Sequence, residues 1–405
     1  MSPPSGRSVL MIAPTPFFAD RGCHVRIYEE ARLLRDLGYR IEICTYHNGR
    51  DIDDFPTHRI LNVPWYRKLG PGPSWQKLYL DVLLFFRCIS VVREMKPDII
   101  HGHLHEGALI GSVLGRLFSI PCIADFQGSL TLELDDHGFG GRFRPLYRFL
   151  EWAEGCIDRM PDGIFASSAA MAEDATGRFG VDGDQVTVVP DAVGAHFFNG
   201  EGGLSREAAG IPADATVIVF MGVLTKHQGV DTLLDAAQIV LRDRPDAFFL
   251  VMGYPGEEAL REDAARRGIG ERVLFTGRVD YVGTGAYLAL SDLAVSPKVS
   301  ETEGNIKLFY YMAAGLGTIV FESGPNREIL GDLGVYARDR SAEAFAEAIL
   351  STMKRPDELP ELGAALRKRA SEVCCWDNSR DRVARVYERL ISASGSGAEG
   401  EGAGS

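Results

Sequence analysis

The segment Gly304-Asn305-Ile306-Lys307 combines residue types that suit the binding of a diphosphate. It follows an apolar run that ends at Ser296, it opens a helical pattern, and Lys298 stands on its other side. The N-terminus of a helix offers unpaired N–H groups and the positive end of a dipole, and glycine lets a ligand approach the backbone closely. A surface loop with two solvated lysines would have the same spacing, so both interpretations stay open.

A second glycine-rich loop, at residues 222–229, also follows an apolar run and opens a helical pattern. Lys226 or Gln228 in this loop would reach a nearby phosphate, although an ordinary turn between a strand and a helix looks the same. Near the N-terminus, Gly22 precedes a third helical pattern. Contact with a ligand and close helix packing both explain a glycine at that position.

Three histidines, His101, His103 and His105, alternate where an apolar strand pattern ends. Alternation along a strand points side chains to one side, so the three residues form a metal site or line a cleft. We favour the lining of a cleft, because a His-x-His at a strand end more often lines a cleft than binds a metal. No CxxC or Cys/His metal pattern is present, and the DxD motif at residues 51–53 lies in a polar loop. The sequence therefore predicts no bound metal and no cofactor.

Composition and charge argue against several classes of protein. The net charge of −13 disfavours binding to nucleic acid, and neither a P-loop nor a dinucleotide fingerprint is present. Seven scattered cysteines suit a reducing, cytoplasmic setting, and we expect no secretory signal. The longest apolar stretch, at 78–92, is broken by Asp81 and Arg87, which argues against a membrane span and favours a buried helix over an interfacial one.

The 405 residues favour two domains, and short apolar runs alternate with amphipathic runs in both halves. This alternation predicts an α/β fold of two Rossmann-like, doubly wound domains that face a central cleft, with ligands beyond the carboxyl ends of the strands. The expected parts are an N-terminal domain over 1–198, a C-terminal domain over 199–376, a helix over 377–392 that crosses back to the N-terminal domain, and a disordered tail over 393–405.

Taken in order, several segments resemble the family 4 retaining glycosyltransferases with the GT-B fold, from about residue 9 to residue 390. They lie at 97–103, 188–193, 222–231, 273–278 and 307–315. The resemblance implies an N-terminal domain that binds the acceptor and a C-terminal domain that binds a nucleotide sugar. The implied donor-binding residues are Gly22, Gly222, Gln228, Gly277, Arg278, Val279, Glu303, Gly304, Asn305, Ile306 and Lys307, of which 277–279 would lie near the base.

The chain departs from the family's pattern at five positions, which hold Gln127, Val223, Gln228, Thr302 and Tyr310. Thr302 and Tyr310 replace a pair of glutamates, and Gln127 replaces a histidine of some members. Val223 replaces an arginine, and Gln228 replaces a lysine. Several substitutes remain polar, and Lys226 and Lys298 would supply the missing charge. We therefore favour an active, divergent enzyme over an inactive relative.

The resemblance implies transfer of a hexose-type sugar from a nucleotide-diphosphate sugar, with a UDP-sugar favoured, to an acceptor hydroxyl with retention. Lys226, Lys298, Lys307 and the helix N-terminus would stabilise the leaving diphosphate, so no metal is required. Gln127 and His103 would position the donor sugar or the acceptor hydroxyl. The alternatives are a catalytically inactive nucleotide-sugar-binding protein and a nucleotide-sugar epimerase of the same architecture.

The acceptor stays open among a lipid, a glycan and a small metabolite, and we expect residues 51–76 to determine its choice. The expected location is the cytoplasm, and a peripheral contact with the inner membrane surface is also left open.

Overall fold

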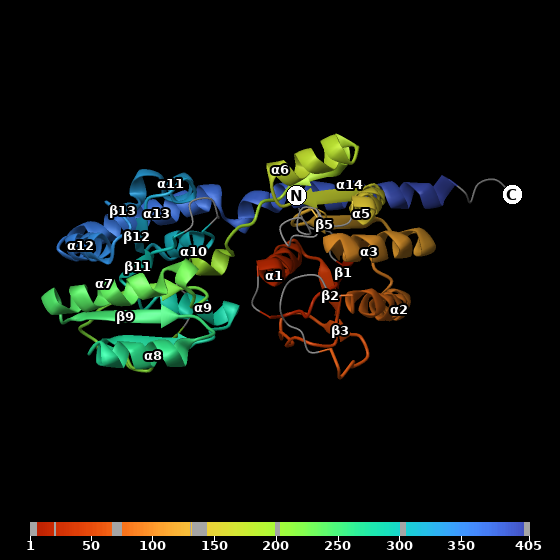
Figure 1. Cartoon of the computed structure of the whole chain (residues 1–405). Coiled ribbons are helices and arrows are strands. Elements are labelled where there is room, and N and C mark those ends of the chain that lie inside the picture. The colour runs from red at the N-terminus through yellow and green to blue at the C-terminus, as the bar shows by residue number, and fades with distance from the viewer. Residues whose placement is uncertain are drawn as a thin grey trace. The chain divides into compact units, whose positions relative to one another are not determined.

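The computed structural model describes residues 6–19, 22–66, 75–129, 131, 144–198, 203–299 and 305–400, without the side chains of 144–146 and 395–400. The chain divides into two compact units (Figure 1). Unit 1 comprises Met1–Asp191 and Ser379–Ser405, and unit 2 comprises Ala192–Asn378. The boundaries between the units thus fall after residues 191 and 378, whereas the sequence predicts them after residues 198 and 376.

Unit 1 is built on a seven-stranded parallel sheet in the order β3-β2-β1-β4-β5-β6-β7. Its strands are β1 (Ser8–Ala13), β2 (Arg40–Thr45), β3 (Thr57–Arg59), β4 (Ile99–His103), β5 (Cys122–Phe126), β6 (Gly163–Ala166) and β7 (Val186–Val188). The central strands are buried along their whole length, because helices cover both faces of a parallel sheet.

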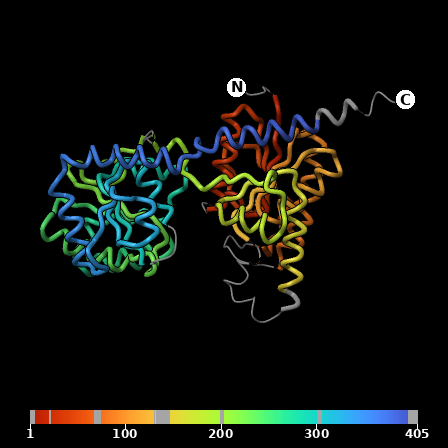
Figure 2. The backbone as a smooth tube through the Cα atoms, turned by 90° about the horizontal axis from the view of Figure 1, so that it is seen from above, coloured from red at the N-terminus to blue at the C-terminus, as the bar shows by residue number. Residues whose placement is uncertain are grey.

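The helices of unit 1 are α1 (Gly22–Asp36), α2 (Lys77–Met95), α3 (Leu104–Phe118), α5 (Arg144–Asp158), α6 (Ala169–Glu173) and α14 (Arg380–Gly400). Alternate residues of β4 serve opposite faces of the sheet. Ile100 packs into the core with α2 and α3, whereas His101 contacts Tyr387 of α14. Figure 2 shows α14 running along unit 1. This helix includes positions 393–400 of the tail that composition predicts to be disordered, and 401–405 lie outside the described residues.

Unit 2 has a six-stranded parallel sheet in the order β10-β9-β8-β11-β12-β13. Its strands are β8 (Thr216–Met221), β9 (Ala247–Met252), β10 (Val273–Gly277), β11 (Leu293–Ser296), β12 (Gly317–Phe321) and β13 (Val335–Ala337). Its helices are α7 (Val230–Asp243), α8 (Glu257–Arg266), α9 (Tyr281–Leu288), α10 (Lys307–Ala314), α11 (Gly324–Leu330), α12 (Ala342–Met353) and α13 (Leu359–Val373).

Two doubly wound units with parallel sheets confirm the predicted α/β class. The longest apolar stretch forms α2, and this helix is buried on one side and exposed on the other. Leu80, Leu84 and Cys88 face the core, while Leu78, Val82 and Phe86 are exposed. Within the described part of the chain, no helix is both long and apolar enough to cross a membrane.

Candidate functional site

The ammonium of Lys307 lies at the centre of the predicted diphosphate site in unit 2. Its Nζ donates a hydrogen bond to Oε1 of Gln228 at 2.7 Å and lies 4.6 Å from the ring centroid of Phe220. Burial of the ammonium, together with the charge of Lys298, lowers the pKa of Lys307 to about 7. A bound anion would favour the charged form of this lysine, because it would offset both the burial of the ammonium and the repulsion from Lys298.

Gly222 makes room for that ammonium. A Cβ built on Gly222 would lie 2.8 Å from Nζ of Lys307, and the φ of Gly222 is +151°, a conformation that L side chains rarely adopt. The structure therefore brings together three of the predicted residues, Gly222, Gln228 and Lys307, which come from the loop after β8 and the first turn of α10.

The loops after β8 and β11 lie against each other. A Cβ on Gly229 would lie 1.9 Å from the carbonyl oxygen of Pro297, and the backbone N–H of Val299 donates to the carbonyl oxygen of His227 at 3.2 Å. Lys298, between these two contacts, is buried. In contrast, the Lys226 side chain is exposed on a short turn, and its backbone carbonyl accepts a bond from Gly229.

Asn305 fixes the start of α10 through buried contacts. Its Nδ2 donates to Oγ of Ser296 and to Oδ1 of Asn326, both at 3.1 Å, and Asn326 in turn donates to the carbonyl oxygen of Phe321. The side chain of Asn305 thus holds the helix N-terminus on β11 and α11, while Ile306 beside it is half exposed. Two further predicted residues, Glu303 and Gly304, lie outside the described residues.

The residues predicted to lie near the base follow β10. Gly277 has a φ of +69°, and its carbonyl oxygen accepts a bond from Gly253. Arg278 is exposed, with its guanidinium 5.5 Å from the ring centroid of Tyr254, and Val279 beside it is half-buried. An exposed guanidinium beside an aromatic ring gives a flat surface on which a base can stack.

Unit 1 contains a buried polar network around Asp125, at the end of β5. Arg26 of α1 donates to both oxygens of Asp125, Gln127 donates to Oδ2 at 3.1 Å, and Nδ1 of His103 lies 3.4 Å from the same oxygen. Burial alone would raise the pKa of Asp125, but the charge of Arg26 and the hydrogen bonds hold it well below its usual range. The carboxylate therefore stays ionised and orients both predicted catalytic residues of unit 1, His103 and Gln127.

His101 and His103 stack on each other, with ring centroids 4.4 Å apart. Burial lowers the pKa of both imidazoles, which favours their neutral form. Glu30 lies 3.5 Å from Nε2 of His101 and 3.7 Å from Nδ1 of His103, so these three residues form a group of potential metal ligands. Arg26 lies 3.1 Å from the Glu30 carboxylate, so this carboxylate already has a cationic neighbour.

His105 does not share a face with the other two histidines, so that expectation was wrong. Leu104 adopts a φ of +59° and starts α3, which turns His105 away from the strand. Its ring stacks on Phe126, and its Nε2 lies 3.5 Å from both Glu154 and Asp158.

Gly22 begins α1 and is exposed. A Cβ built there would meet no described atom within 4 Å, which argues against close helix packing as the reason for this glycine. Arg26, Glu30 and Asp125 were missed from the sequence. An aspartate inside the apolar run Cys122–Phe126 is the one local signal of a buried polar site, although it does not identify the partners of Asp125.

Two family models match the chain. The one described as "Glycosyl transferase 4-like domain" matches residues 21–192, and "Glycosyl transferases group 1" matches residues 204–372. Between them they cover most of both units. The chain is therefore a glycosyltransferase that uses a nucleotide-sugar donor, and it belongs to the family 4 glycosyltransferases of GT-B fold.

Two relatives carry the names of transferases, and a solved structure shares the fold. A phosphatidyl-myo-inositol mannosyltransferase of Mycobacterium leprae is 27% identical over 95% of this chain and 97% of its own. Sulfoquinovosyl transferase SQD2 of Arabidopsis thaliana is 23% identical over 80% of this chain, which spans 61% of that protein. The structure of Anabaena Alr3699/HepE in complex with UDP-glucose superimposes with a TM-score of 0.64 at 14% identity, over 94% of this chain and 99% of its own.

Proposed function

We propose that this enzyme transfers a hexose from a UDP-sugar to an acceptor hydroxyl with retention of anomeric configuration and without a metal. The observation that carries the proposal is the Lys307 ammonium, which Gln228 holds beside the bare backbone of Gly222. The fold shared with a protein solved with UDP-glucose supports the choice of donor.

The main obstacle to this reaction is the charge that develops in the transition state. As the bond between the anomeric carbon and the diphosphate breaks, the electron pair leaves with the phosphate oxygen and the sugar becomes cationic. Lys298, Lys307 and the N-terminus of α10 stabilise the leaving group, and Lys226 joins them from its exposed turn. The acceptor hydroxyl attacks from the same face and gives its proton to the departing phosphate oxygen.

In unit 1, we propose that His103 and Gln127 position the acceptor hydroxyl or the donor sugar. Asp125 accepts from Gln127 and lies against Nδ1 of His103. If Nδ1 carries the proton, Nε2 of His103 is left as a hydrogen-bond acceptor, and it has no partner among the described residues. Such an acceptor suits a hydroxyl group.

We propose an acceptor at a membrane surface, on the cytoplasmic side, which the enzyme reaches as a peripheral protein. The mannosyltransferase from Mycobacterium leprae carries a phosphatidyl lipid in its name, which supports a lipid among the three acceptor classes.

The test is a donor screen with purified enzyme. UDP-, GDP-, ADP- and TDP-sugars are compared by thermal shift and then by transfer to lipid, glycan and small-molecule acceptors, with and without EDTA. We expect UDP-hexose to stabilise the protein and to give an α-linked product from an α-linked donor, unaffected by EDTA. Binding without any transfer would indicate an inactive sensor, and epimerisation of the donor alone would indicate an epimerase.

A further inference from the structure

Helices α2 and α3 carry apolar stripes on the side that faces away from the sheet. On α2, Leu78, Val82 and Phe86 recur every four residues and are 73%, 54% and 63% exposed. The exposed stripe on α3 has the same spacing and consists of Leu109, Val113 and Leu117. The opposite sides of both helices are already buried in the core of unit 1. Helices that are apolar on two sides present a surface for a further apolar partner.

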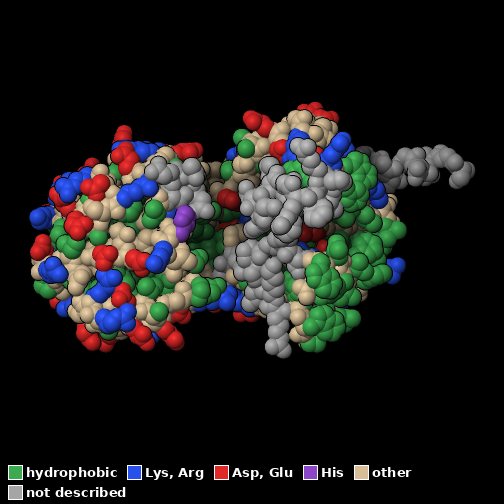
Figure 3. Space-filling model, viewed as in Figure 1, with side chains coloured by type: hydrophobic (Ala, Val, Ile, Leu, Met, Phe, Trp, Pro, Cys, Tyr) green, Lys and Arg blue, Asp and Glu red, His purple; other side chains and the backbone are tan. Residues whose placement is uncertain are grey.

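Large aromatic side chains extend these stripes. Phe149 and Trp152 of α5 pack with ring centroids 5.7 Å apart and are both mostly exposed, and Trp65 and Trp75 stand exposed shortly before α2. Because α3 packs against both α2 and α5, the outward side chains of the three helices form one surface. We call the two stripes and these four aromatic residues the apolar face. Figure 3 shows hydrophobic side chains gathered over this side of unit 1.

The exposed charges around the apolar face are mostly positive, although the protein carries a net charge of −13. Among the described side chains of α2, α3, α5 and the residue that ends each helix, the exposed charged ones are Arg93, Glu94, Lys96, Arg116, Arg148 and Arg159. Five of these six are basic. An acidic protein with a locally basic apolar surface has the charge distribution that anionic lipid headgroups attract.

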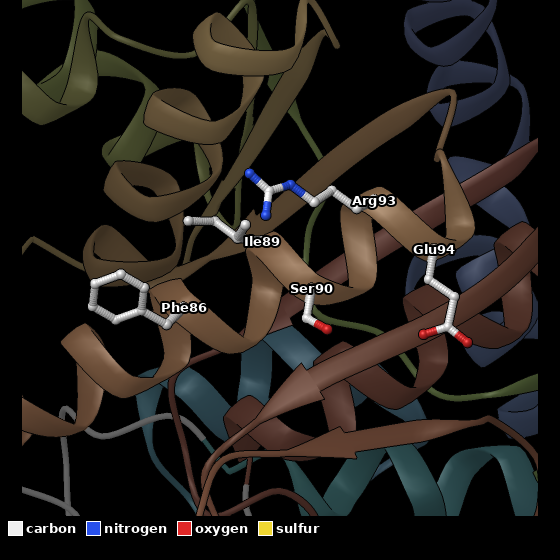
Figure 4. A pocket seen from close by; sticks show the side chains of 5 residues that line it. All are labelled: Phe86, Ile89, Ser90, Arg93 and Glu94. Carbon is white, nitrogen blue, oxygen red and sulfur yellow. The ribbon is translucent and has the colours of Figure 1, made fainter.

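Two open grooves place arginines beside apolar side chains. One, of about 290 Å³, lies along α5. Trp152 lines it together with three arginines, Arg148, Arg159 and Arg178, and with Glu151, which forms an ion pair with Arg178. The other, of about 530 Å³, lies on α2, where Figure 4 shows Arg93 extending past Ile89 with Phe86 one turn away. Glu94 also lines this groove. Each groove thus offers a guanidinium for a phosphate next to apolar surface for acyl chains.

A bilayer fits this face better than a second copy of the chain. Three of the four tryptophans, Trp65, Trp75 and Trp152, are exposed on it, and tryptophan favours the boundary between headgroups and acyl chains. In a two-fold dimer built on this face, the basic residues of one copy would meet those of the other, and their repulsion would oppose association.

We propose that the apolar face inserts into the headgroup region of a bilayer that contains anionic phospholipids, with Arg93 and Arg148 contacting phosphate groups. The inference deepens the proposed function, because it names the surface with which a membrane-bound acceptor would be reached. The basic side chains set the preference for anionic lipid, and the stripes and tryptophans supply the apolar contact.

The test is binding of the full chain to vesicles of pure phosphatidylcholine or of phosphatidylcholine with phosphatidylglycerol, followed by flotation. We expect binding to the anionic vesicles only, with tryptophan fluorescence quenched by brominated lipid. The double variant R93Q/R148Q should bind at least about tenfold more weakly. V82S/F86S should lose binding by a similar factor, whereas V373S, which removes an exposed apolar side chain of unit 2, should bind like the unchanged protein.

Equal binding to both kinds of vesicle, or binding unaffected by R93Q/R148Q, would overturn the inference. So would a dimer that V82S/F86S dissociates in the absence of lipid. UDP-induced thermal stabilisation, measured on the same variants, reports on the donor site and on correct folding. Its absence in all proteins would contradict the proposed function, while loss of vesicle binding with this stabilisation intact concerns only the apolar face.

Discussion

Nζ of Lys307 and Oε1 of Gln228 are 2.7 Å apart, and they join the first turn of α10 to the loop after β8. The bond links two segments that lie 79 residues apart in the chain. An ammonium that is buried near a second lysine and held by a neutral amide is poised to receive an anion.

Binding of UDP should therefore take up a proton at Lys307. With the pKa of Lys307 lowered to about 7 in the free protein, the side chain is largely a neutral amine at pH 8. A bound diphosphate favours the charged ammonium. The affinity for UDP should fall by up to about tenfold per pH unit above pH 7. Titration calorimetry in two buffers of different ionisation enthalpy measures the proton uptake.

Lys307→Gln should abolish that uptake and flatten the pH dependence. Lys354→Gln, a change at an exposed lysine elsewhere in unit 2, should leave both unchanged. Proton uptake that persists in Lys307→Gln would assign the titration to another group.

Lys298→Ala should lower turnover by roughly a hundredfold or more, because the buried ammonium stabilises charge that develops on the leaving group. Steady-state kinetics with saturating donor and acceptor give the comparison, and Lys354→Ala is the matched control. Near-normal turnover in a folded Lys298→Ala protein would remove this residue from the mechanism.

The fold was predictable where burial dictates the pattern. Thr216–Met221 and Ala247–Met252 stand out in the sequence as short, largely apolar runs because helices cover both faces of their sheet, and in the structure each run forms one strand. The short strands β3 and β13 do not stand out in the sequence, since three residues that are mostly half-buried leave too little pattern to recognise.

The same contrast holds for the site. The glycine spacing around Gly222 and the helix start at Lys307 were visible as local features of the sequence. The network around Asp125 was not, because Arg26 lies 99 residues away in the chain and only the fold brings the two together. His105 was misplaced because the chain turns into a helix at Leu104, where a longer strand was expected.

Removal of the Arg26 guanidinium should destabilise unit 1 strongly. Asp125 would remain buried without its main partner, at a cost of about 3–5 kcal/mol. Arg26→Met is compared with the double variant R26M/D125N in urea unfolding followed by circular dichroism, and the second change should recover part of the loss. Arg35→Met, at a half-exposed arginine of the same helix, should cost less than about 1 kcal/mol. Equal effects of Arg26→Met and Arg35→Met would contradict a structural role for the buried pair.

Asp158 should make the protein less stable as the pH rises. Burial, with the nearby charges of Glu154 and Asp174, raises the pKa of Asp158 to about 8, whereas an unfolded chain has an aspartate pKa near 4. Between about pH 4 and pH 8 the folded state thus binds the additional proton, so the free energy of unfolding falls across this range and levels off above it.

Asp158→Asn keeps the shape without the charge and should be more stable than the unchanged protein by on the order of 1–3 kcal/mol at pH 8, with the gap closing toward pH 5. Urea unfolding from pH 5 to pH 9 measures the gap, and Asp53→Asn, at an exposed position of unit 1, should show none that varies with pH. Parallel curves for Asp158→Asn and the unchanged protein would mean that this carboxyl group titrates in the folded protein as it does in the unfolded chain.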